Sequence, residues 1–210
     1  MPIYQTITTK NRAIDTSLPH GMSYLVTTER TLYKFDELDE RAQEKALELF
    51  WDLNVDYDWW DTTYRDAASI GLRITGFDFD HRNTISGKLT DYMLDSCKLI
   101  RENHGRECET FKTAKDYLNQ YIAAFVKWRE IEQSSEVDDE FENWKPIDFL
   151  EEFKWTDEAR EIEEEYRKAL LEDYLSILRE EYDYLTSEEN IKESIRANDY
   201  LFTEYGTHAI

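Results

Sequence analysis

The feature of the sequence that most constrains the fold is a series of apolar side chains between Thr156 and Leu185, spaced three and four residues apart. This spacing matches the period of an α-helix, and Thr156 is a suitable N-cap. A helix of roughly 28 residues at 1.5 Å per residue is about 42 Å long. Other elements must cover its apolar stripe, which consists of Ala159, Ile162, Tyr166, Ala169, Leu170, Ile177, Leu178, Tyr182 and Leu185.

The composition is sufficient for a packed core and argues against disorder throughout the 210 residues. Hydrophobic residues make up 40% of the chain and aromatic residues 14%, and aromatic side chains are costly to leave exposed. No apolar run approaches the roughly 20 residues that span a bilayer. Cys97 and Cys108 are the only cysteines. We therefore expect a cytoplasmic protein whose two thiols are reduced and buried, with a disulfide between them as the alternative.

The N-terminal residues predict a leader followed by a hairpin. Residues 1–23 mix Thr, Asn, Pro and Gly without a period, which is typical of a flexible or partner-ordered leader. Two strand-like pieces, Ser23 to Thr27 and Thr31 to Phe35, flank a polar tip and predict an antiparallel hairpin.

Two helices are expected next. Asp36 or Asp39 can cap a helix whose apolar stripe ends at Leu53. Residues 55–70 repeat the helical spacing, and Gly71 is a suitable left-handed stop.

The period then changes to strict alternation, which predicts a hairpin between Leu72 and Leu89 with a bulge at Gly76. Thr90 can cap a helix that closes at His104, and a longer helix is expected from Thr110 to Ile131. Residues 132–154 break the helical pattern and predict an exposed connection or a short helix.

The last part of the chain predicts the long helix, a short helix capped by Ser187 and a final strand from Tyr200 to Thr203. The predicted fold class is α+β and mainly helical, with a small antiparallel sheet formed by the hairpin and edge strands, five to seven helices and one long C-terminal helix. The expected regions are the leader at 1–23, an α+β core at 24–131 and an acidic helical subregion at 132–210.

Negative charge is concentrated in residues 130–189. This stretch holds 23 Asp and Glu but 6 Lys and Arg, which accounts for 17 of the 22 excess negative charges of the chain. Such an anionic field repels nucleic acid phosphates and membrane surfaces and attracts cationic protein surfaces. The sequence therefore predicts a basic, nucleic-acid-binding host protein as the partner. It predicts neither direct nucleic acid binding nor membrane association, and it leaves the oligomeric state open, a dimer being one possibility.

The acidic residues could act as a nucleic acid mimic. Carboxylates three and four residues apart on a helix lie about 5 to 6 Å from each other, which is close to the spacing of phosphates along a nucleic acid strand. Arg160, Arg167, Lys168 and Arg179 interrupt the row, so a solvated helix with internal ion pairs is the alternative. The expected partner-binding residues, with three tryptophans as anchors, are Glu136, Asp138, Asp139, Glu140, Glu142, Trp144, Glu151, Glu152, Trp155, Asp157, Glu158, Glu161, Glu164, Glu165, Glu172, Asp173 and Trp59.

Catalytic signatures are weak. Asp78, Asp80 and His81 could bind a divalent metal or act as acid and base, but a solvent-facing strand edge entering a turn is the interpretation that the sequence favours. His104 and Cys108 match none of the zinc spacings. No phosphate-binding loop, HExxH or GxSxG motif is present. We expect no enzyme activity, no cofactor, no bound metal and no catalytic residues.

Three stretches of the chain resemble a known family. They are TLYKFDELDERAQEKALELFWDLNVDYDWWDTTYRDAASIGLRITGFDFDHRNTISGKL, ENHGRECETFKTAKDYL and LLEDYLSILREEYDYLTSEENIKESIRANDYLFTEYG. The family consists of small acidic uncharacterised proteins encoded by phages, prophages and plasmids, some of them labelled antitoxin-like. The resemblance covers about residues 31–206 and implies an origin in a mobile element, but no reaction and no functional residues.

These observations support one main hypothesis and three alternatives. The main hypothesis is a phage or mobile-element protein that binds and inhibits a basic, nucleic-acid-binding host defence protein, such as a restriction, CRISPR or recombination nuclease, by nucleic acid mimicry. The alternatives are an acidic scaffold or regulatory protein without mimicry, a metal-dependent enzyme using Asp78, Asp80 and His81, and a pocket protein that sequesters a small molecule between aromatic side chains.

Overall fold

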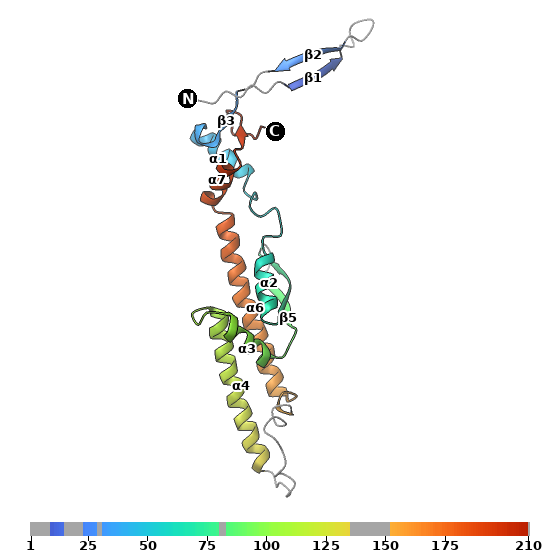
Figure 1. Ribbon diagram of the computed structural model, residues 1–210, viewed down its shortest axis with the longest axis vertical. Coiled ribbons are helices and arrows are strands. Elements are labelled where there is room, and N and C mark those ends of the chain that lie inside the picture. Colours follow the sequence, from blue (N-terminus) through green and yellow to red (C-terminus); the bar gives the residue numbers. More distant parts are fainter. Residues whose placement is uncertain (1–8, 15–22, 29–30, 80–82, 135–151, 210) are drawn as a thin grey trace. The chain divides into compact units, whose positions relative to one another are not determined.

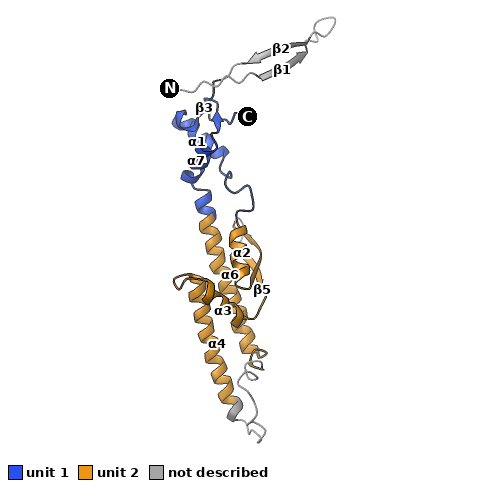
Figure 2. Cartoon of the chain, in the orientation of Figure 1, with its two compact units in different colours: residues 1–59, 182–210 blue, residues 60–181 orange. Residues whose placement is uncertain are grey.

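The chain divides into two compact units. The structure is a computed structural model that describes residues 9–14, 23–28, 31–79, 83–134 and 152–209. Unit 1 is formed by residues 1–59 and 182–210, and unit 2 by residues 60–181 (Figure 2). The boundary expected between residues 131 and 132 falls inside unit 2.

The strands of unit 1 pair differently from the prediction. β1 (Thr9–Ile14) and β2 (Ser23–Thr28) form an antiparallel ladder. The predictions that residues 1–23 form a leader without a strand and that β2 pairs with the following strand are therefore wrong. β3 (Tyr33–Lys34) instead pairs with β6 (Leu201–Phe202), which lies close to the other end of the chain. Local alternation identified the strands, but it carried no information about distant partners.

The helices of unit 1 begin at the expected caps. A 3₁₀ turn, η1 (Phe35–Glu37), precedes α1 (Glu40–Leu49), and the Asp39 carboxylate accepts a hydrogen bond from the backbone N–H of Ala42 at 2.8 Å. Ser187 caps α7 (Glu188–Ala197) as predicted. The core between these elements consists of Phe35, Leu38, Ala42, Ala46, Ile191, Ile195 and Phe202.

Residues between α1 and α2 form turns rather than the helix expected from residue 55. Helix α2 (Asp61–Ser69) begins six residues later than predicted, and Gly71 follows it in the left-handed region at φ +77°. The predicted hairpin is present as β4 (Leu72–Asp78) and β5 (Thr84–Leu89), and the register shifts between Ile74 and Gly76, which confirms the bulge.

Three further helices complete unit 2 (Figure 1). α3 (Met93–Asn103) packs on α4 (Glu109–Ser134), and α6 (Asp157–Leu185) is the predicted long helix, with Thr156 accepting a hydrogen bond from the N–H of Ala159 at 3.2 Å. The prediction that Thr90 caps α3 is wrong: its hydroxyl donates to the carbonyl of Gly71 at 3.2 Å.

The core of unit 2 is one cluster to which all of its helices and the hairpin contribute. Its largest fully buried side chains are Tyr166, Tyr174 and Phe153. Phe153 packs against three aromatic rings of α4, with centroid distances of 5.1 to 5.7 Å. α6 and the turn before it therefore hold the other elements of unit 2 in place.

The predicted α+β class, the predominance of helices and the long helix near the C-terminus are confirmed. The strands of the described residues form three separate two-stranded ladders rather than one small sheet. Within the same residues, no helix is long and apolar enough to cross a membrane.

Candidate binding surfaces

Seven of the predicted partner-binding residues lie outside the described part of the chain. These residues are Glu136, Asp138, Asp139, Glu140, Glu142, Trp144 and Glu151. The rest of the predicted surface lies on α6 and the turn before it, apart from Trp59.

The exposed face of α6 carries two kinds of carboxylate. Three of them form ion pairs within the helix: Asp157 with Arg160 at 3.6 Å, Glu165 with Lys168 at 2.7 Å, and Glu164 with both Arg167 and Lys168. Glu158, Glu161 and Glu172 are exposed and form no ion pair with any described residue, and the same holds for Glu180 and Asp183 near the end of the helix. The predicted acidic row is therefore partly neutralised, and within its described part Glu158, Glu161 and Glu172 are the exposed members that keep an unpaired charge.

Two further acidic residues of α6 do not face the solvent freely. Burial raises the pKa of Glu163, while a hydrogen bond from the backbone of Met93 opposes that rise. Burial also raises the pKa of Asp173, and its Oδ2 atom is buried without a hydrogen-bond partner. Asp173 is therefore a poor candidate for a partner-binding residue, although its spacing placed it in the predicted row.

The two tryptophans that the structure describes among the predicted anchors have opposite environments. Trp155 is 59% exposed beside Lys154, whose Nζ lies 5.4 Å from the indole centroid, and Glu152 nearby is exposed. Trp59 is only 7% exposed and packs on Tyr182 at 5.8 Å, so its prediction as a surface anchor is wrong. The residues before α2 are not helical, so the helical projection that turned Trp59 outward did not apply.

Two exposed aromatic residues in unit 1 were not singled out as anchors from the sequence. Trp51 and Tyr57 are 55% and 60% exposed, and the neighbouring Asp56 and Asp58 are exposed as well. Aromatic side chains beside carboxylates are suited to contacts with Arg and Lys of a partner. This acidic aromatic segment, residues 51–58, is a second candidate surface for a cationic protein.

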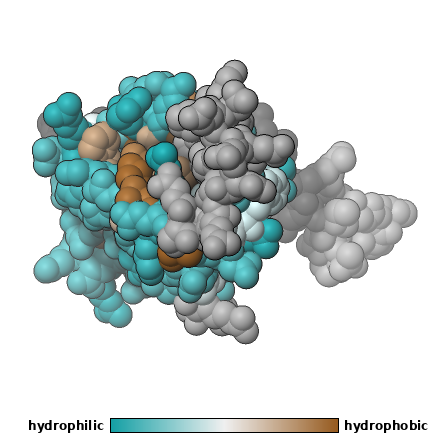
Figure 3. Space-filling model, turned by 90° about the horizontal axis from the view of Figure 1, so that it is seen from below, coloured by the Kyte–Doolittle hydropathy of each residue, from teal (hydrophilic) through white to brown (hydrophobic). Residues whose placement is uncertain are grey.

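Unit 2 also exposes apolar side chains. On α4, Ile122, Val126 and Ile131 are 50%, 49% and 59% exposed. In the space-filling view, hydrophobic residues (brown) form a small patch among hydrophilic residues (teal) (Figure 3). Exposed apolar groups of this kind are available for contact with another molecule.

The predicted metal site stays untested. Asp78 is half-buried at the end of β4, whereas Asp80 and His81 lie outside the described residues. Among the residues that the structure describes, no group of three or more His, Cys, Asp or Glu side chains could hold a metal ion.

A partly buried polar cluster joins α2, the end of α3, α4 and α6. The hydroxyl of Tyr174 donates to Asp66 Oδ2 at 2.7 Å, and Asp66 Oδ1 lies 3.7 Å from His104 Nε2. His104 Nδ1 is 2.7 Å from the hydroxyl of Thr110, and its buried Nε2 has no hydrogen-bond partner. Burial, followed by the hydrogen bond to Asp66, raises the pKa of Tyr174, which keeps the phenol neutral as a donor.

This cluster has the parts of an acid–base pair, but its arrangement is that of a structural network. Tyr174 is fully buried and the side chain of His104 is 9% exposed, so neither group faces a substrate-sized opening. Sequence reasoning missed the cluster because its members are separated by up to 108 residues.

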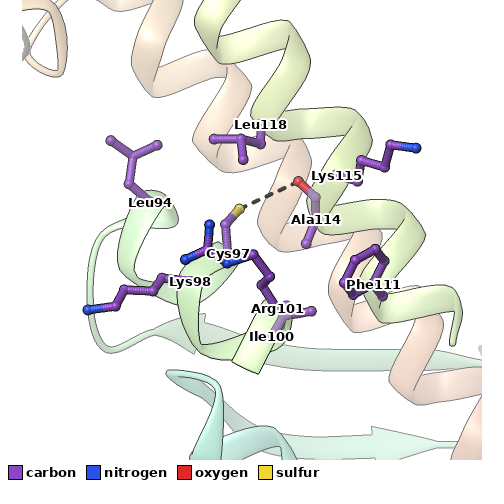
Figure 4. Close-up of a pocket in the computed structure, with 9 residues that line it drawn as sticks. All are labelled: Leu94, Cys97, Lys98, Ile100, Arg101, Phe111, Ala114, Lys115 and Leu118. Atoms are coloured by element: carbon purple, nitrogen blue, oxygen red, sulfur yellow. Dashed lines mark hydrogen bonds between the residues drawn. The ribbon is translucent and has the colours of Figure 1, made fainter. Parts of the chain in front are cut away.

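One cavity of unit 2 lies between α3 and α4 and has a volume of about 260 Å³. Its apolar lining comes from Leu94, Cys97, Ile100, Phe111, Ala114 and Leu118, and its charged lining from Lys98, Arg101 and Lys115 (Figure 4). The three cations come from two helices, and only the packing of those helices brings them to one opening, so this group could not be predicted from the sequence.

The two cysteines are free, and they differ in exposure. Cys97 is buried and its thiol donates to the carbonyl of Ala114 at 3.6 Å, and burial raises its pKa. Cys108 is exposed, so the prediction that both thiols are buried is wrong for this residue.

Comparisons of the chain with protein-family models, with curated proteins and with solved structures find no match. The fold and the surfaces define an acidic α+β protein with exposed carboxylates on a long helix.

Proposed function

We propose that the protein binds and inhibits a basic, nucleic-acid-binding protein of a host cell through the exposed carboxylates of α6. The observation that carries this proposal is that three predicted partner-binding residues of that helix, Glu158, Glu161 and Glu172, are exposed and form no ion pair with a described residue, in a chain of net charge −22. A cationic groove that normally holds phosphates would be attracted to such a face. We propose a host defence protein as the partner because the sequence resemblance, if it reflects descent, implies an origin in a mobile element.

The ion pairs along the helix refine the proposal. Part of the acidic charge is already paired within the helix, in the ion pairs of Asp157, Glu164 and Glu165 with Arg160, Arg167 and Lys168. A partner would therefore gain less binding free energy from these carboxylates. The unpaired carboxylates can form new ion pairs without breaking old ones. Exposed Trp155 lies just before the same helix and could add an aromatic contact.

The test compares two triple variants with the same change in net charge. E158Q/E161Q/E172Q removes these three unpaired carboxylates, and D157N/E164Q/E165Q removes the three paired ones. Exposed ion pairs contribute roughly 0.2 to 1 kcal/mol each, so the first variant should lose about 1.5 kcal/mol, or roughly tenfold in affinity. The second variant should lose much less, because its carboxylates are already compensated.

Binding is measured by capture from a bacterial lysate on the immobilised protein, followed by titration of the captured protein. Capture should weaken steeply as salt rises and should be competed by duplex DNA if the partner uses its nucleic-acid groove. If both triple variants lost the same amount of affinity, the unpaired carboxylates would not form a local docking face, and the attraction would come only from the overall negative charge of the protein. Capture that resists salt and DNA would favour the scaffold alternative over mimicry.

A further inference from the structure

The cavity between α3 and α4 has a cationic lining. Its lining contains Lys98, Arg101 and Lys115 and no acidic residue, in a protein of net charge −22. None of these three cations forms an ion pair with another described residue. By contrast, Lys112 on the same helix is paired with Glu109 at 2.7 Å. The three cations at the opening therefore remain unpaired, although the protein has a large excess of acidic residues.

The floor of the cavity is apolar. Ile100, Cys97 and Ala114 are buried at its base, and Leu94, Phe111 and Leu118 form half-buried walls. The Cys97 thiol is directed to the carbonyl of Ala114, so it serves the packing of α3 on α4 and is not offered to a ligand (Figure 4). The site combines an apolar floor with a cationic opening.

The three cations do not point in the same direction. In Figure 4, Lys98 and Lys115 extend away from each other to opposite sides of the cavity, while the Arg101 side chain runs back along α3 toward Cys97. A guanidinium group presents a planar fork that matches a carboxylate with two parallel hydrogen bonds. Arg101 is therefore the best placed of the three to hold an anionic group beside the apolar floor.

We propose that this cavity binds a small apolar carboxylate, with its carboxylate on Arg101 and its apolar body against Ile100, Phe111 and Leu118. The volume of about 260 Å³ lies just under the range of roughly 300 to 1,000 Å³ for drug-sized ligands, which suits an aromatic acid with a single ring. A nucleic acid is excluded by the size of the cavity and by repulsion from the surrounding net negative charge. The proposal concerns a different surface from the exposed face of α6 and does not depend on the function proposed above.

The first experiment uses the unaltered protein and three probes of equal ring size: benzoate, benzamide and benzylamine. Binding is followed by chemical-shift changes of backbone amides in α3 and α4. Benzoate should bind about tenfold more tightly than neutral benzamide, because only the carboxylate can accept a charged fork of hydrogen bonds. Benzylamine should bind most weakly of the three. Equal affinities for benzoate and benzamide, or no shifts in α3 and α4 with benzoate, would overturn the proposal.

The second experiment assigns the carboxylate contact. R101Q should reduce benzoate affinity about tenfold and leave benzamide affinity unchanged, while R106Q, a matched change at an exposed arginine outside the cavity, should change neither. Both substituted side chains are exposed, and an unchanged urea midpoint would show that each variant is folded. Benzoate affinity that survives R101Q, or falls equally with R106Q, would refute the role of Arg101.

Discussion

The contact between Tyr174 and Asp66 should be worth a measurable coupling energy. Tyr174 is fully buried on α6, and its hydroxyl donates to Asp66 Oδ2 on α2 at 2.7 Å. The Asp66 side chain is 51% exposed. Tyr174→Phe removes the hydrogen bond, but the half-exposed carboxylate regains water, so we expect a cost of about 1 kcal/mol.

Asp66→Ala should cost more than Tyr174→Phe. It leaves a buried phenol without an acceptor, and the penalty for such a group is about 2 kcal/mol. Once Tyr174 is Phe, removing Asp66 should cost little. The double variant should therefore be about 1.5 kcal/mol more stable than the sum of the single effects predicts.

The measurement is urea unfolding of the wild type and the three variants at pH 7, followed by far-UV circular dichroism, which reports mainly the helices. Tyr57→Phe, at a 60% exposed position, is the matched control and should leave the midpoint unchanged. Additive effects within about 0.3 kcal/mol would refute the reasoning, because independent sites add within that error.

Two further substitutions test other features. Gly206→Ala should destabilise unit 1 by about 3 kcal/mol or more, because Gly206 has φ +72° and an added Cβ would lie 2.0 Å from the carbonyl oxygen of Ala42. Gly105→Ala is the control in the same urea assay and should be nearly neutral, because the atom nearest to its added Cβ is Cys108 Sγ at 3.6 Å. Equal effects of the two substitutions would contradict the close approach of Gly206 to Ala42. Asp173→Asn should stabilise the protein at pH 7. Burial raises the folded pKa of Asp173 above its unfolded value, so the native state loses stability as pH rises from the unfolded pKa through the folded one. The gain from Asp173→Asn should therefore vanish in acid, whereas Glu180→Gln, at an exposed position of α6, should show no such pH-dependent gain.

Local signals in the sequence were sufficient for most elements. The caps at Asp39, Thr156 and Ser187 are supplied by side chains that bond to a backbone N–H three residues ahead, so each could be found from neighbouring residues alone. The bulge at Gly76 was visible in the same way, because it shifts the alternation of the strand.

Predictions that needed distant partners failed. The partner of β2 is β1, and β3 pairs with β6 more than 160 residues away. Trp59 is buried by Tyr182, which is also far along the chain. A periodic pattern states which side of an element is apolar, but it does not state which element covers that side.

The candidate surfaces show the same difference between features set by local spacing, which could be predicted, and features set by packing, which could not. The ion pairs of α6 follow from spacings of three and four residues, so Arg160, Arg167 and Lys168 could be identified as interruptions of the acidic row. The cationic opening could not be identified, because Lys98 and Arg101 on α3 meet Lys115 only when the two helices pack.

The pairing of β3 with β6 has a consequence for the order in which the protein can form. Unit 1 takes its residues from both sides of unit 2, which is continuous from residue 60 to residue 181. During translation, every residue of unit 2 leaves the ribosome before the first residue of α7. β3 and α1 therefore cannot reach their final packing until their partners β6 and α7 have been synthesised.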